Sequence, residues 1–155
     1  MRRTIFIIAV LGSLLCGVGG APGSNTGAPT AEQVIVMLRA AGFPIGKIKI
    51  YSASNDANLL LGRPGQYTGK VNFRDRRIKD GGGGFAVSSG GSIEVFASKA
   101  DARRRSNYVT AIFQSASPSV PSEYDYLEGN TFLRLSHVLT PVQARKYEAA
   151  LRRFV

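Results

Sequence analysis

Apolar residues recur with helical spacing in three segments, and each segment follows a residue of the kind that commonly caps a helix. The first segment ends at Gly42 and has Gln33 three residues after its cap, which matches a capping box. The second covers residues 99–114, and the third has Pro141 at the favoured first position. The three caps are Thr30, Ser98 and Thr140. We therefore predict three amphipathic helices.

Five other segments predict β-strands, and two of them, residues 47–50 and 67–73, alternate between apolar and polar residues with the period of two that is typical of a strand. The five segments cover about residues 47–50, 67–73, 93–97, 124–128 and 131–136. A Gly-Asn pair at 129–130 separates the last two segments and favours a tight hairpin turn. In the second segment, the alternation predicts that Tyr67, Val71 and Phe73 share one face. Residues 85–87 are a candidate for an additional short strand.

The order of these elements predicts an α+β fold, with a small antiparallel or mixed sheet and about three helices packed on one face. The stretch from about 92 to 154 has the order βαββα and resembles half of a ferredoxin-like sandwich, a likeness of fold only. We expect residues 30–155 to form one domain, because their number suits one hydrophobic core. Residues 21–29 are rich in Gly, Pro and Ser and predict a flexible spacer.

Residues 1–20 have the pattern of a signal peptide. Arg2 and Arg3 precede an apolar run at residues 4–15, which is shorter than the ~20 residues of a membrane-spanning helix. Cleavage before Ala21 would give a secreted, extracellular protein. Alternatively, a lipid on Cys16 would anchor a lipoprotein on the outer face of the cytoplasmic membrane. Cys16 is the only cysteine, which excludes an intrachain disulfide.

Basic residues outnumber acidic ones, and the formal net charge is +10. Such a surplus attracts anions, so anionic envelope polymers and lipid headgroups are the expected partners. Nucleic acid is not expected, because few aromatic residues lie among the arginines. The alternative is a solvated charge that only keeps the domain soluble. The candidate anion-contacting residues are Arg63, Arg74, Arg76, Arg77, Arg103, Arg104 and Arg105.

No complete catalytic set is recognisable, so we do not expect an enzyme, a metal or a cofactor. The glycine-rich segment 81–91 lacks the Gly-Lys-Ser/Thr of a phosphate loop, and we expect a mobile hairpin loop there. His137 is the only histidine and accompanies no Gly-x-Ser-x-Gly elbow, which favours a structural role. Glu123, Asp125 and Glu128 share one hairpin strand, where solvated positions explain them.

The segment Asn58–Lys70, with the sequence NLLLGRPGQYTGK and followed by Asp75, resembles a recurrent block in small exported bacterial proteins, largely actinobacterial. The resemblance extends over about residues 45–155 and includes the Arg-rich helix and a Tyr-x-Tyr hairpin. It implies a secreted or lipoprotein-like envelope component without catalytic residues. Within the block, glycines and Pro64 predict a tight loop from which Arg63 projects, either to clamp an anion or to pin the loop.

These observations favour a monomeric, non-enzymatic, exported binding domain of the cell envelope or the extracellular space. One alternative is an enzyme with an unrecognised site, for which a cleft gathering Tyr67, His137 and an acid would be the first structural sign. Another is a secreted proteinaceous inhibitor that presents the loop at residues 62–66.

Overall fold

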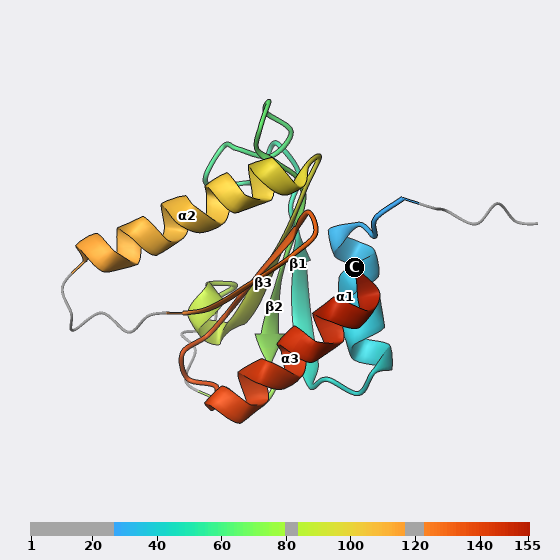
Figure 1. Ribbon diagram of the computed structural model, residues 1–155. Helices are drawn as coiled ribbons and strands as arrows, with labels where there is room; N and C mark the ends of the chain where they lie inside the picture. The colour runs from blue at the N-terminus through green and yellow to red at the C-terminus, as the bar shows by residue number, and fades with distance from the viewer. Residues whose placement is uncertain (1–26, 80–83, 117–122) are drawn as a thin grey trace, which may run out of the picture.

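The computed structural model describes residues 27–79, 84–116 and 123–155, so the predicted signal peptide, Cys16 and most of the spacer lie outside the described residues. The fold is α+β, as predicted, with a five-stranded antiparallel sheet and three helices (Figure 1). The elements are α1 (Ala31–Ala40), β1 (Ile45–Ile50), β2 (Tyr67–Asp75), the 3₁₀ turn η1 (Val87–Ser89), β3 (Gly90–Phe96), α2 (Lys99–Ser115), β4 (Tyr124–Glu128), β5 (Thr131–Leu135) and α3 (Pro141–Phe154). The strand order is β1-β2-β3-β5-β4.

The three predicted helix starts are confirmed by their capping hydrogen bonds. Thr30 Oγ1 accepts from the Gln33 amide at 3.2 Å, and Gln33 Oε1 accepts from the Thr30 amide at 2.8 Å. Thr140 and Gln143 repeat this capping box in front of α3. Ser98 Oγ accepts from an amide of the first turn of α2. Each cap satisfies an amide that has no partner inside its helix.

The helices lie on both faces of the sheet, and the expectation that all of them pack on one face is wrong. α1 and α3 cover the face that carries Val95 and Leu133, whereas α2 covers the face that carries Phe96 and Phe132 (Figure 1). Neighbouring residues of a strand point to opposite faces, so β3 and β5 each carry buried apolar side chains on both faces. Two separate hydrophobic clusters result, and each requires its own helical cover.

The strand order of the C-terminal half agrees with the ferredoxin-like expectation, because β5 lies between β3 and β4. α2 and α3 nevertheless cover opposite faces of the sheet, which departs from that likeness. None of the helices in the described part of the chain is long and apolar enough to cross a membrane.

Tyr67 lies on the α2 face, although the alternation in the sequence places it with Val71 and Phe73. The pairing of β2 with β3 shifts register between Tyr67 and Gly69, so an extra residue interrupts the alternation. The Tyr67 ring consequently packs edge-on against Phe96, with the ring centroids 6.1 Å apart. A β-bulge of this kind has no clear signal in the sequence pattern.

Residues 84–89 of the glycine-rich segment belong to the connection between the antiparallel strands β2 and β3, as expected of a hairpin, but the inclusion of Gly90 and Gly91 in the predicted loop is wrong. Gly90 and Gly91 begin β3. A Cβ on Gly91 would lie 2.6 Å from Phe73 Cζ, so only glycine fits beneath that ring. The additional strand at residues 85–87 is also wrong, because the chain leads into the 3₁₀ turn η1 instead. Residues 81–83 lie outside the described residues.

Candidate functional site

A row of five polar side chains crosses the whole sheet on the α2 face. Its members are register partners on neighbouring strands, namely Lys49, Asn72, Ser92, Arg134 and Asp125. We call these five residues the polar row. α2 packs on the apolar side chains farther along the same face, so the polar row lies beside the helix and not beneath it. A face that is apolar at one end and polar at the other is typical of a binding surface rather than of a closed core.

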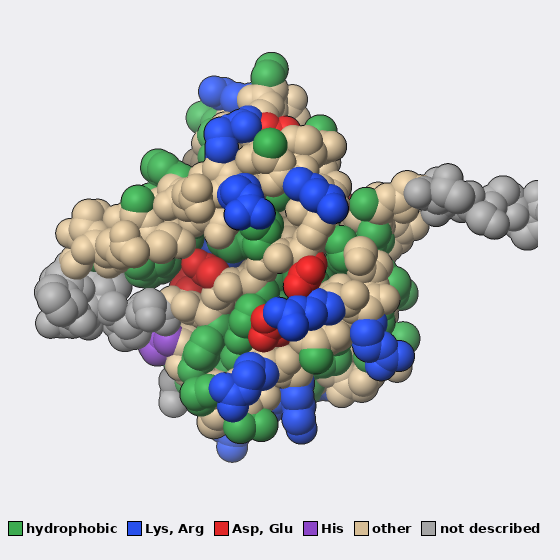
Figure 2. Space-filling view, viewed as in Figure 1, with side chains coloured by type: hydrophobic (Ala, Val, Ile, Leu, Met, Phe, Trp, Pro, Cys, Tyr) green, Lys and Arg blue, Asp and Glu red, His purple; other side chains and the backbone are tan. Residues whose placement is uncertain are grey.

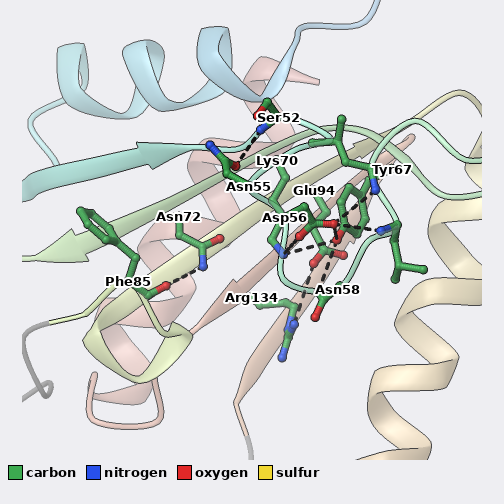
Figure 3. Close-up of polar contacts among 12 residues, drawn as sticks. Ser52, Asn55, Asp56, Asn58, Tyr67, Lys70, Asn72, Phe85, Glu94 and Arg134 are labelled. Carbon is green, nitrogen blue, oxygen red and sulfur yellow. Dashed lines mark hydrogen bonds and ion pairs between the residues drawn. The ribbon is translucent and has the colours of Figure 1, made fainter.

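Asp56, in the loop between β1 and β2, ties that loop to the sheet (Figure 3). Its carboxylate is 1% exposed and accepts from the Tyr67 hydroxyl at 2.6 Å and from Lys70 Nζ at 3.1 Å. The amides of Leu60 and Leu61 also donate to it. Burial alone would raise the pKa of Asp56, but the hydrogen bonds from Tyr67, Leu60 and Lys70 outweigh it and hold that pKa well below its usual range. Asp56 is therefore an anion at neutral pH.

Lys70 is held among aromatic rings as well as by Asp56. Its Nζ lies 4.6 Å from the centre of the Tyr51 ring and 5.0 Å from that of Tyr67. Lys49, from the edge strand β1, lies 4.7 Å from the same Tyr51 ring. Two ammonium groups thus share one ring on the polar face, an arrangement in which the ring partly offsets the loss of hydration.

Glu94 anchors a second buried network, between the sheet and α2. It is fully buried and accepts from Arg105 Nε at 2.9 Å, and Arg134 Nη1 lies 3.9 Å from it. Arg134 is also paired with Glu123, at 2.7 Å. Burial alone would lower the pKa of Arg105, but the hydrogen bond and the negative charge of Glu94 outweigh burial and raise that pKa above its usual value. The guanidinium therefore stays charged.

Asp125 ends the polar row on β4 and differs from the other acids of the site. Burial and the negative charge of Glu123 raise the pKa of Asp125 to about 6, although Arg134 acts in the opposite direction. Its Oδ1 is buried and has no hydrogen-bond partner among the described residues. A carboxyl group in this state takes up a proton close to physiological pH.

Two adjoining hollows lie over this face. One, of about 530 Å³, is bounded by Lys49, Lys70, Asn72, Ser92 and residues 84–87. The other, of about 680 Å³, lies between α2 and residues 58–66 and is bounded by Arg104, Arg105, Tyr108, Ile112 and Phe113. Asn58 and Arg134 border both hollows, which we together call the groove. Among the described residues that line it are five cationic side chains and no Asp or Glu.

The groove brings together only part of the predicted anion-contacting residues. Arg104 and Arg105 line it. Arg74 follows the groove residue Asn72 by two positions in β2, roughly 7 Å along the strand, and Arg76 and Arg77 follow the end of that strand, and none of the three lines the groove. Arg77 is paired there with Asp75, and Arg63 and Arg103 are exposed. Figure 2 accordingly shows Lys and Arg side chains spread over the molecule in this view instead of in one patch.

The block Asn58–Lys70, which the sequence analysis singled out, forms much of the groove. Asn58, Leu60, Gly65 and Gln66 line the hollow beside α2, and Lys70 lines the other. The loop at residues 62–66 is held by internal hydrogen bonds, including Gly62 amide to Tyr67 carbonyl at 2.9 Å. The loop proposed for an inhibitor is thus one wall of this groove.

The residues that sequence reasoning missed are the interior polar positions of the strands. Lys70 and Asn72 in β2, Glu94 in β3 and Arg134 in β5 resemble ordinary solvated positions of a strand. They are buried or half-buried instead, since the Asp56 loop, η1 and α2 lie over them. The available signal was a polar residue in each of three neighbouring strands, but their pairing register cannot be read from alternation alone.

The residues considered for an enzyme, Tyr67, His137 and an acid, do not come together in this structure. Tyr67 donates to an acid, Asp56, but His137 is exposed and follows the opposite end of β5. The cleft that would gather Tyr67, His137 and an acid is therefore not formed. Within the described ranges, no three His, Cys, Asp or Glu side chains are placed to hold a metal ion.

Comparison of this chain with family models, with curated proteins and with solved structures finds no match. The resemblance to small exported bacterial proteins therefore stays a prediction.

Proposed function

We propose that this chain is an exported, non-enzymatic binding domain of the cell envelope or the extracellular space, and that it takes an anionic ligand in the groove. The observation that carries the proposal is the lining: five cationic side chains, with no carboxylate among the described lining residues. Ammonium and guanidinium groups offer several N–H donors each, and a phosphate or carboxylate group is their natural acceptor.

The arrangement of the ion pairs supports this proposal. Asp56, Glu94 and Glu123 hold Lys70, Arg105 and Arg134 in place but do not line the groove themselves. The acids thus fix the cations, while the remaining N–H groups are available to a ligand. Side chains held on strands in this way lose little conformational entropy on binding.

Export is proposed from the sequence of residues 1–20, and the mass of the protein isolated from its producing cells tests it. A mass that corresponds to residues 21–155 means a secreted protein. A mass of residues 16–155 plus a diacylglycerol group on Cys16 means a tethered lipoprotein. A mass that retains residues 1–15 contradicts export by either route.

Titration with methyl phosphate, followed by calorimetry, tests the binding site. Lys49→Gln removes a groove cation that has no carboxylate partner among the described residues. We expect binding to weaken about tenfold, because hydrogen bonds to charged groups contribute roughly 1.5–3 kcal/mol. Lys47→Gln is the matched control, since Lys47 belongs to the same strand but borders a different hollow. Absence of saturable binding, or an equal loss in both variants, contradicts the proposed site.

A further inference from the structure

We infer that the ligand is an anionic amphiphile, whose single phosphate or carboxylate group binds over Lys49, Asn72, Ser92 and Arg134 of the polar row and whose apolar part lies between α2 and residues 58–66. This inference rests on the proposed function and narrows it. Three features of the groove lead to it: the balance of its charges, two buried polar atoms without partners, and an exposed apolar stripe on α2.

The charge network around the groove is close to neutral. Four of its five cations have a carboxylate partner, and the pairs are Lys70–Asp56, Arg104–Asp101, Arg105–Glu94 and Arg134–Glu123. Lys49 alone has none among the described residues. A polyanion requires an extended surplus of positive charge. The groove instead suits one anionic group, recognised through hydrogen bonds at short range.

Two buried polar atoms mark where the anionic group binds. Ser92 is 1% exposed and Asn72 is 6% exposed, and both line the hollow over the polar row. Ser92 Oγ and Asn72 Oδ1 have no hydrogen-bond partner among the described residues, and the two residues are register partners. Asn72 Nδ2 already donates a hydrogen bond of 2.6 Å to the Phe85 carbonyl oxygen (Figure 3). A buried polar atom without a partner is costly. Ser92 Oγ can donate to an anionic oxygen of a head group, whereas Asn72 Oδ1 can only accept, from a hydroxyl of the same head group such as that of a hydrogen phosphate ester.

The other hollow has the lining expected for an apolar chain. Leu60, Val109 and Phe113 form its apolar wall. Tyr108 and Ile112 also line it, and they are 59% and 46% exposed, one helical turn apart on α2. Large apolar side chains exposed beside a hollow favour a ligand that covers them.

Arg134 and Asn58 connect the two parts, because both border both hollows. A ligand whose head group contacts Arg134 therefore has a direct path for its chain toward Ile112. Head and tail would be recognised by different elements, the head by the sheet and the tail by the helix and the loop.

A series of alkyl phosphates tests the inference on the whole protein, with methyl, butyl, hexyl and octyl phosphate each kept below its micelle concentration. We expect affinity to rise about two- to fourfold per methylene group, because burial of one methylene contributes up to about 0.8 kcal/mol. Ile112→Gln should flatten this rise, because it should weaken octyl phosphate binding more than methyl phosphate binding. Val142→Gln is the matched control, because Val142 is an apolar residue of α3 that is 57% exposed. Alkyl carboxylates of the same lengths, in parallel, distinguish the two head groups.

The outcomes separate the two proposals. If methyl phosphate binds in the groove but longer chains bind no more tightly, the amphiphile is wrong and the proposed function stands. If no member of either series binds, both proposals are wrong. If the protein binds vesicles with 30% anionic lipid but no monomeric amphiphile, a membrane surface is the partner and the inference is overturned. Circular dichroism of each variant shows whether a loss of binding comes from unfolding.

Discussion

Lys70 and Asp56 are 14 residues apart in the chain and form a buried ion pair of 3.1 Å. This pair joins the interior of β2 to the loop that closes one side of the groove. Both partners are almost fully buried, so their mutual attraction and the hydrogen bonds to Asp56 must offset a large loss of hydration. The loop and the sheet consequently behave as one unit at the site.

Asp56→Asn should lower the free energy of unfolding at pH 7 by about 3–5 kcal/mol, because Lys70 is left buried without its counter-charge. The pKa of Asp56 is lower in the folded protein than in the unfolded chain, so this stability is present above about pH 4 and is lost as the pH falls below it. Urea unfolding of the unchanged protein and of the Asp56→Asn variant, at pH 7 and at pH 3, measures this loss of stability. The difference between their free energies of unfolding should be smaller at pH 3 than at pH 7. An equal difference at both pH values would contradict the stabilising role of the Lys70–Asp56 pair.

Arg105→Ala should cost about 3–5 kcal/mol, whereas Arg103→Ala should cost less than about 0.5 kcal/mol. Arg105 neutralises the fully buried Glu94, while Arg103 is exposed two residues earlier on the same helix. Chemical denaturation of the two variants is a direct comparison. Similar stabilities would show that the Glu94 network adds nothing to the fold.

Asp125→Asn should stabilise the protein at pH 7 by about 1–2 kcal/mol, less than its full pKa shift implies because Asp125 is only half-buried. With a pKa of about 6, the folded protein holds a proton between about pH 4 and pH 6 that the unfolded chain has released. Stability should therefore fall as the pH rises through this window, and the substitution should remove that slope. A carbon-13 NMR titration of the Asp125 carboxyl with a midpoint near 4 would rule this out.

Gly91→Ala should lower the free energy of unfolding by about 1–3 kcal/mol or more. Its Cβ would lie 2.6 Å from Phe73 Cζ and 2.7 Å from the Arg134 carbonyl oxygen, so the ring and the β3–β5 pairing would have to move. Gly84→Ala is the control, because nothing lies within 4 Å of its added Cβ. Thermal unfolding of the two variants should differ clearly, and matching midpoints would mean that β3 has more space than the structure shows.

The local parts of this fold could be predicted from the sequence. Thr30, Ser98 and Thr140 mark their helices through hydrogen bonds to residues three positions away, and such contacts are encoded locally. The face occupied by Tyr67 could not be predicted, because it depends on a bulge in the pairing with another strand. The side of the sheet that α2 covers depends in turn on Phe96 and Phe132, which lie in strands far apart in the chain.

The site was predicted less well than the fold, for a related reason. Arg104 and Arg105 were found because they stand in a conspicuous run of arginines. Asn72, Ser92 and Arg134 form one row only through long-range register, and each alone resembles a solvated strand position. The surplus of arginines in the sequence therefore indicated a basic surface, whereas the buried polar residues on neighbouring strands locate the groove.

Chemical-shift mapping with octyl phosphate tests whether the groove is the binding site, because it locates the ligand without any substitution. We expect saturable shifts in the backbone amides of Asn72, Ser92, Arg134 and Ile112, with little change around Arg76 and Arg77. Saturable shifts centred on Arg63 or on Arg76 and Arg77, or no saturable shift at all, would contradict the groove as the binding site.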